Sequence, residues 1–170
     1  MKLQHQYAAR VEDVKWLTAE QVEDWRALVA LSMALPSALD AQLKRDSGLT
    51  SFEYHVLAAL SESPGRSLPM SVLATLASGS MSRVSHVVAR LEDAGWVERR
   101  PSTQTGCRTD AHLTDAGWLK IQQSAPGHVA EGRRLVVDAL TPEELQALGA
   151  AARKIVQVAD PRMGARFALT

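Results

Sequence analysis

Residues 69–100 read PMSVLATLASGSMSRVSHVVARLEDAGWVERR, and this stretch decides the fold. Residues 81–94 repeat apolar side chains at the i, i+3, i+4 and i+7 spacing of a helix that buries one face. Ser80 stands where a helix N-cap belongs, and Gly95 stands where glycine commonly ends a helix. A shorter helix is predicted over residues 69–77, with a tight turn at Ser78-Gly79. The side chains predicted to be buried are Val72, Leu73, Leu76, Val84, Val87, Val88 and Leu91.

After Gly95 the apolar pattern changes to the period of two that indicates strands. Residues 96–100 predict one strand, residues 101–107 a polar loop, and residues 108–113 the returning strand. A short helix, a tight turn, a helix and a hairpin follow one another in the order of a winged helix-turn-helix. We therefore predict a mainly α fold with a small β-wing, whose second helix enters the major groove of DNA.

The outward face of this second helix carries side chains that can contact DNA. Arginine can donate two hydrogen bonds to guanine, serine can contact a base or a phosphate, and the helix N-terminus favours phosphate. A solvated helix face is the alternative interpretation. However, residues 80–109 also hold five Arg against three Asp and Glu, a local excess of two positive charges. The candidate residues on this face are Ser82, Arg83, Ser85, His86 and Arg90.

Capping boxes mark the starts of three further helices. In each box the side chains of the first and fourth residues can accept hydrogen bonds from each other's backbone amides. The boxes are Thr18-Ala19-Glu20-Gln21, Thr50-Ser51-Phe52-Glu53 and Thr141-Pro142-Glu143-Glu144. They predict helices over residues 19–46, 51–62 and 142–158. Pro36 should kink the first of these, or two helices meet there. Another helix, the fifth in chain order, should begin at Thr114-Asp115, bend at Pro126-Gly127 and resume over residues 129–139.

The terminal helices carry more apolar surface than the winged unit can cover. Residues 142–158 alone present Leu145, Leu148, Ala152 and Ile155 on one stripe. We infer a two-fold dimer with interleaved terminal helices, whose recognition helices face half-sites about one DNA turn apart. The predicted organisation is one intertwined domain. Residues 1–48 form an N-terminal segment and first dimerisation helix, residues 49–113 the winged helix-turn-helix, and residues 114–170 the C-terminal dimerisation helices.

Composition excludes several classes of protein. The 170 residues are 46% hydrophobic and 22% charged, which suits roughly one globular domain. No apolar run approaches the roughly 18 residues of a membrane span, and the first residues lack a secretory signal. The single cysteine cannot form an internal disulfide, so we expect a cytoplasmic protein. Lys and Arg total 19, as do Asp and Glu, so DNA binding must rest on a local patch.

No pattern in the sequence points to catalysis, a metal or a cofactor. Ser85 and His86 are adjacent on a helix and point in different directions, so they do not form a nucleophile–base pair. There is no Gly-rich phosphate loop, and the five histidines lack metal-ligand spacing. Cys107 beside Arg108 suggests a redox switch, but we favour an incidental exposed thiol. We expect no enzyme activity, no metal and no cofactor.

Several pieces of the chain, each weak alone, stand in a specific order and spacing. They are Trp16-Leu17-Thr18, Trp25-Arg26, residues 49–53, residues 80–99 and Leu113-Thr114-Asp115-Ala116-Gly117. Over roughly residues 16–158 the chain resembles the multiple-antibiotic-resistance regulator (MarR) family of bacterial transcription factors, and it looks like an actinobacterial member. The resemblance implies a homodimer that binds a palindromic operator in double-stranded DNA and usually represses. It also implies a small aromatic or anionic effector that releases the DNA.

The resemblance also assigns roles by position. It makes Ser82, Arg83, Ser85 and His86 the groove readers, while Arg90 pairs with a phosphate or braces the wing. Many family members carry an acidic residue followed by Arg at the wing tip, where the Arg enters the minor groove. Here the stretch is Thr105-Gly106-Cys107-Arg108, which lacks the acidic residue, so we expect Arg108 to contact phosphate only. The rest of the predicted DNA-binding set is Ser80 and Arg100.

Two hypotheses remain open on the residues alone. Trp25 and His55 lie on helices that would border an effector pocket, although packing in the core or the dimer interface is the competing interpretation. The second functional class is a dimeric helical interaction scaffold whose winged unit no longer binds DNA, as zero net charge and the altered wing allow. Salt separates the two classes, because phosphate contacts make affinity fall steeply as salt rises.

Overall fold

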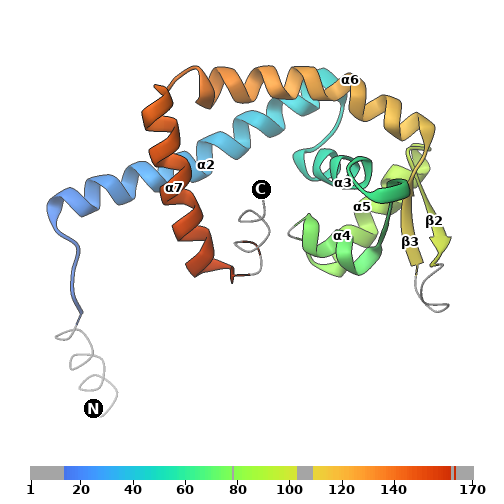
Figure 1. Cartoon of the computed structure of the whole chain (residues 1–170), viewed down its shortest axis with the longest axis horizontal. Coiled ribbons are helices and arrows are strands. Elements are labelled where there is room, and N and C mark those ends of the chain that lie inside the picture. Colours follow the sequence, from blue (N-terminus) through green and yellow to red (C-terminus); the bar gives the residue numbers. More distant parts are fainter. Residues whose placement is uncertain (1–13, 78, 103–108, 162, 164–170) are drawn as a thin grey trace, which may run out of the picture. The chain divides into compact units, whose positions relative to one another are not determined.

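The computed structural model describes residues 14–77, 79–102, 109–161 and 163. Its residues cluster into two compact units, Met1–Pro36 and Ser37–Thr170, and each unit is described by itself. The described part of the chain is mainly helical with a small antiparallel sheet, as the sequence predicts (Figure 1). The predictions on the wing loop, including Cys107 and Arg108, lie outside the described residues.

Helix α2 spans Ala19–Ser47 and begins at the predicted capping box. The Thr18 amide donates to Gln21 Oε1 at 3.0 Å, and the Gln21 amide donates back to Thr18 Oγ1 at 3.2 Å. Pro36 lies inside the helix, so the alternative of two helices meeting there is wrong. The boundary between the two compact units nevertheless falls directly after Pro36, where the helix lacks one amide donor.

The winged unit begins with α3 (Ser51–Ser61), whose capping box at Thr50 and Glu53 is also confirmed. A short 3₁₀ turn, η1 (Pro64–Arg66), leads into strand β1 (Ser67–Pro69). Helices α4 (Met70–Leu76) and α5 (Met81–Asp93) follow, close to the predicted bounds. Ser80 caps α5, and Gly95 takes the left-handed conformation, φ +74°, that ends the helix.

The wing is a three-stranded antiparallel sheet in the order β1-β3-β2. Strand β2 (Val97–Pro101) pairs with β3 (Thr109–Leu113) as the predicted hairpin, with Val97 opposite Leu113. Strand β1 is an addition that the sequence did not predict. Its three residues are too few to show a period of two, and their order comes only from pairing with β3.

After the wing, α6 (Asp115–Gly132) begins at the N-cap Thr114 and passes through Pro126. Helix α6 is continuous through Pro126, so the interruption implied by the predicted restart at residue 129 is absent, while the predicted bend stays a prediction. Ile121 and Ser124 before the proline are buried, and His128 after it contacts Gln42 of α2. These contacts stabilise the residues before and after Pro126 in one continuous helix, although the proline removes one backbone hydrogen bond. A π-helical segment, η2 (Arg133–Val137), and helix α7 (Pro142–Ala159) complete the described chain.

The buried core lies in the winged unit and the helix ends that flank it. Its apolar side chains run from Leu43 at the end of α2 to Ile121 in α6, and α7 contributes no buried residue. The predicted inward face of α5, namely Val84, Val87, Val88 and Leu91, is buried. In α4, Leu73 is buried, but Val72 is 41% exposed, which corrects that prediction. Val72 lies one residue from the buried Leu73, so it points to a different side of the short helix.

Candidate nucleic-acid interface

Helix α5 presents the predicted polar face to solvent. Ser82, Arg83, Ser85 and His86 are all exposed, opposite the four buried apolar residues of the same helix. Ser80 accepts a hydrogen bond from the Arg83 amide at 3.2 Å through its hydroxyl, so it is occupied as an N-cap. The amides of the first turn still point out of the helix, which makes this end favourable for phosphate.

Arg83 is held by an aromatic ring instead of a carboxylate. Its guanidinium carbon lies 4.1 Å from the centroid of Phe52, a partly buried residue in the first turn of α3. Among the described residues Arg83 forms no ion pair, so its charge is not neutralised locally. Sequence reasoning used Phe52 only as a spacer in a capping box, and no short-range signal links it to Arg83.

Arg90 is placed against α3. Its Nη2 lies 2.6 Å from Glu53 Oε1, and the Glu53 side chain is only 6% exposed. The other Glu53 oxygen accepts hydrogen bonds from the Thr50 amide at 2.7 Å and from the Thr50 hydroxyl at 2.8 Å. Within the described residues Arg90 therefore pairs with the N-terminal turn of α3 and not with the wing, and its predicted contact with a phosphate stays a prediction.

Arg99 connects the wing to α5, a role that the sequence analysis missed. Its Nη1 lies 2.9 Å from Glu92 Oε2, its Nη2 donates to the carbonyl of Ser85 at 2.8 Å, and its amide donates to Glu92 Oε1 at 2.9 Å. Arg100 points elsewhere and pairs with Glu98 on the same strand. Of the predicted wing arginines, Arg108 lies outside the described residues.

An open cleft of about 670 Å³ lies between the start of α4, helix α5 and the wing. Most of its exposed surface is apolar, and Ser85 and Arg99 are among the polar residues that line it. The cleft thus borders the same face of α5 that carries the candidate DNA contacts. It is lined by Pro69, Met70, Ser71, Met81, Ser85, Arg99 and Thr109.

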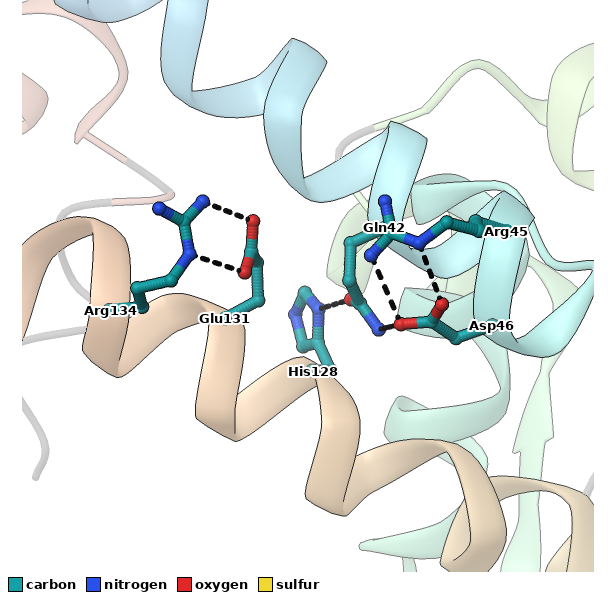
Figure 2. A network of polar contacts seen from close by, with 6 residues as sticks. All are labelled: Gln42, Arg45, Asp46, His128, Glu131 and Arg134. Atoms are coloured by element: carbon teal, nitrogen blue, oxygen red, sulfur yellow. Dashed lines mark hydrogen bonds and ion pairs between the residues drawn. The ribbon is translucent and has the colours of Figure 1, made fainter.

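A second polar cluster joins α6 to the end of α2 (Figure 2). The side chain of Gln42 is nearly buried. Its Nε2 donates to Asp46 Oδ2 at 2.9 Å, and its Oε1 lies 3.3 Å from His128 Nδ1. The hydrogen bond from Gln42, followed by the one from Arg45, lowers the pKa of Asp46. On the next turn of α6, Glu131 accepts two hydrogen bonds from Arg134, which lowers the pKa of Glu131.

Two histidines meet an aromatic ring beside this cluster. The ring centroids of Tyr54 and His128 are 4.4 Å apart, and those of Tyr54 and His55 are 6.1 Å apart. Desolvation lowers the pKa of His55 although the residue remains exposed, and desolvation plus repulsion from His55 lowers the pKa of His128. Trp25, the other predicted effector residue, lies in the unit Met1–Pro36 and is 57% exposed.

The described residues contain no group of three or more His, Cys, Asp or Glu side chains arranged to hold a metal ion. None of the helices described here combines the length and the apolar character needed to cross a membrane.

The chain is similar to known regulators over most of its length. A family model described as MarR family matches residues 47–106. Sco3205, a MarR family transcriptional regulator from Streptomyces coelicolor solved in complex with DNA, is 41% identical, with a TM-score of 0.83 over 88% of this chain and 93% of that one. AbsC, another such regulator from Streptomyces coelicolor, is 36% identical, with a TM-score of 0.81 over 86% of this chain and 98% of that one. A search of curated proteins found no match.

Proposed function

Because the chain belongs to the MarR family of transcriptional regulators, we propose that it is a homodimeric repressor that binds a palindromic operator in double-stranded DNA. In this proposal α5 lies in the major groove and the wing contacts the flanking backbone. Sco3205, which shares 41% of its residues with this chain, was solved in complex with DNA, and this supports DNA as the partner.

The observation that carries the proposal is the outward face of α5. It combines short hydroxyl side chains, His86 and one arginine without a carboxylate partner in the described structure. A guanidinium in this state keeps its hydrogen-bond donors for a base edge. We assign Arg83 to a base and Ser82, Ser85 and His86 to the groove. Ser80, Arg100 and Arg108 are assigned to phosphates, while Arg90 braces α3.

The dimer rests on the uncovered apolar faces of the terminal helices. In α7, Leu148 is 37% exposed, Ile155 is 50% exposed and Val158 is 86% exposed. A second copy of the chain is the partner that would cover such stripes and also match a palindrome. We therefore keep residues 1–48 and 114–170 as dimerisation segments around the winged unit of residues 49–113.

A small aromatic or anionic effector is the proposed ligand, and Trp25 and His55 are the residues that we propose to test for its binding. The grouping of Tyr54, His55 and His128 supports this, because aromatic and imidazole rings suit a planar ligand. Trp25→Ala and His55→Ala should each weaken the effector's release of DNA while basal DNA affinity is retained. An equal loss of dimer stability in both variants would instead identify them as packing residues.

The test of DNA binding is a titration of the protein with its own upstream DNA, followed by anisotropy at several salt concentrations. We expect salt-sensitive binding of one dimer to a short palindrome, with a slope of log affinity against log salt near −0.9 per phosphate contact. Arg83→Ala should cost about 1–3 kcal/mol at one base position, and Arg100→Ala should weaken all sequences alike.

Arg134→Ala is the matched control, because it removes one exposed positive charge away from α5. It should leave the discrimination between bases unchanged. If the wild type binds neither its upstream DNA nor random duplex at low salt, the result favours the dimeric interaction scaffold or an effector-loaded form that cannot bind DNA, and it contradicts DNA binding by the protein as purified.

A further inference from the structure

Arg83 differs from its neighbours in how it is held. Arg90, Arg99 and Arg100 each place a guanidinium nitrogen against a carboxylate, on Glu53, Glu92 and Glu98 respectively. Arg83 instead lies over the face of Phe52, with its guanidinium carbon 4.1 Å from the ring centroid. A carboxylate occupies donors of the fork, whereas a ring face attracts the cation and leaves its edge donors free.

The ring of Phe52 is itself positioned by the turn between α4 and α5. A Cβ placed on Gly79 would lie 2.6 Å from Phe52 Cζ and 3.0 Å from Cε2, so any side chain there would displace the ring. Phe52 also packs against the buried core. The adjacent residue, Glu53, anchors α5 again through Arg90, two helical turns beyond Arg83. The first turn of α3 thus supports α5 at two points.

From these contacts we propose that Phe52 is a positioning residue for sequence-specific DNA recognition, and that it acts by holding the Arg83 guanidinium in the orientation that reads a base. Phe52 lies in α3, outside the two helices α4 and α5 that form the helix-turn-helix itself, and it does not contact the DNA in this scheme. The inference rests on the proposed function, because it requires Arg83 to contact a base. It adds that specificity at the base pair contacted by Arg83 depends on both Phe52 and Arg83.

Phe52→Leu tests this proposal, because leucine keeps an apolar side chain at the same place but removes the ring face. The probe is the upstream operator duplex and a set of duplexes that change one base pair at a time. The base pair read by Arg83 is the one where Arg83→Ala loses discrimination. At that pair Phe52→Leu should reduce discrimination roughly two- to five-fold, as expected for loss of an exposed cation–π contact. In the Arg83→Ala background, Phe52→Leu should have no further effect there.

Two more variants separate positioning from general stability. Gly79→Ala should displace the Phe52 ring although the aromatic residue is still present. It should therefore reduce discrimination at the same base pair. Trp118→Leu removes a similar contact elsewhere, between Trp118 and the guanidinium of Arg66 at 4.3 Å, and should leave discrimination unchanged even if thermal stability falls.

The outcomes distinguish this proposal from the one it rests on. If the wild type shows no sequence-specific binding, the proposed function and this inference both fall. If the wild type and Arg83→Ala behave as expected but Phe52→Leu discriminates like the wild type, only the positioning role of Phe52 is overturned. A uniform loss across all base pairs in Phe52→Leu would also overturn it, since that pattern reports loosened packing of α5.

Discussion

The carboxylate of Glu53 contacts both the start of its own helix, α3, and helix α5. One oxygen accepts from the amide and hydroxyl of Thr50 at the start of α3, and the other contacts Arg90 of α5. The carboxylate is nearly buried while Arg90 is half exposed, so the two partners differ in what their removal leaves behind. An unpaired buried carboxylate is costly, whereas an exposed guanidinium can return to water.

This asymmetry predicts different costs for the two variants of the pair. Arg90→Ala should lower the free energy of unfolding by roughly 1–3 kcal/mol, because it leaves a buried charge without its partner. Glu53→Gln should cost less, since glutamine still completes the capping box and Arg90 becomes solvated. Denaturant unfolding of both variants and the wild type measures the two costs. Equal losses would contradict the expected difference between removing the buried and the exposed partner.

The histidines beside Tyr54 predict a pH dependence of stability. The pKa of His55 and that of His128 lie below the ordinary value of 6.5, so the unfolded chain binds more protons than the folded one as the pH falls below 6.5. Stability should therefore be fully present above that pH and decrease below it. The pKa values of Asp40 and Asp46 are lowered from 3.8, so these carboxylates titrate below this window.

We expect the melting temperature of the wild type to fall between about pH 7.5 and about pH 5.5. The variant His55→Asn/His128→Asn should lose less over the same interval, because asparagine does not titrate. Thermal unfolding at the two pH values measures the difference. The same decrease in both proteins would assign the pH dependence to other groups.

Among the secondary-structure elements, Arg99 couples the wing to helix α5. It bridges Glu92 and the Ser85 carbonyl, and Ser85 stands in the middle of the candidate DNA-binding face. The contact sets how the hairpin stands against α5. Lysine at this position retains the charge but cannot reach both partners with a planar fork.

Arg99→Lys should therefore weaken operator binding roughly two- to ten-fold, which corresponds to the loss of one or two hydrogen bonds. Arg100→Lys is the control, because in the described residues the Arg100 side chain pairs with Glu98 of its own strand and the position keeps its charge when changed. Anisotropy with the operator duplex measures both variants. If Arg99→Lys binds like Arg100→Lys, the bridge does not orient the wing for DNA.

The elements that could be predicted are those with a local physical cause. The boxes at Thr18, Thr50 and Thr141 are all formed, and the buried stripe of α5 follows its apolar period. Strand β1, the unbroken course of α6 through Pro126 and the Phe52–Arg83 contact depend on partners 31 or more residues away or on packing. No window of sequence contains that information.

For the molecule as a whole, the net charge predicts weak general attraction to DNA, whereas the exposed apolar surface of the terminal helices predicts association between copies of the chain. The net charge is zero, and Arg90, Arg99 and Arg100 are already paired, so the general attraction to DNA is weak. The proposed homodimer would bring two sets of specific contacts to one operator, one from each protomer. We therefore expect useful affinity for DNA to require dimerisation.

The exposed stripe of α7 provides the test of this dependence. Ile155 is 50% exposed, and in a two-fold dimer each substitution acts twice, so Ile155→Asp removes apolar burial and places two carboxylates in the interface. We expect a shift from dimer to monomer in sedimentation at micromolar concentration and a large loss of operator affinity, with the helical circular dichroism retained. Val72→Asp, at a 41% exposed position of α4 outside the terminal helices, should remain a dimer. If Ile155→Asp sediments as the wild type does, α7 is not a dimer contact and its stripe must be covered by another partner.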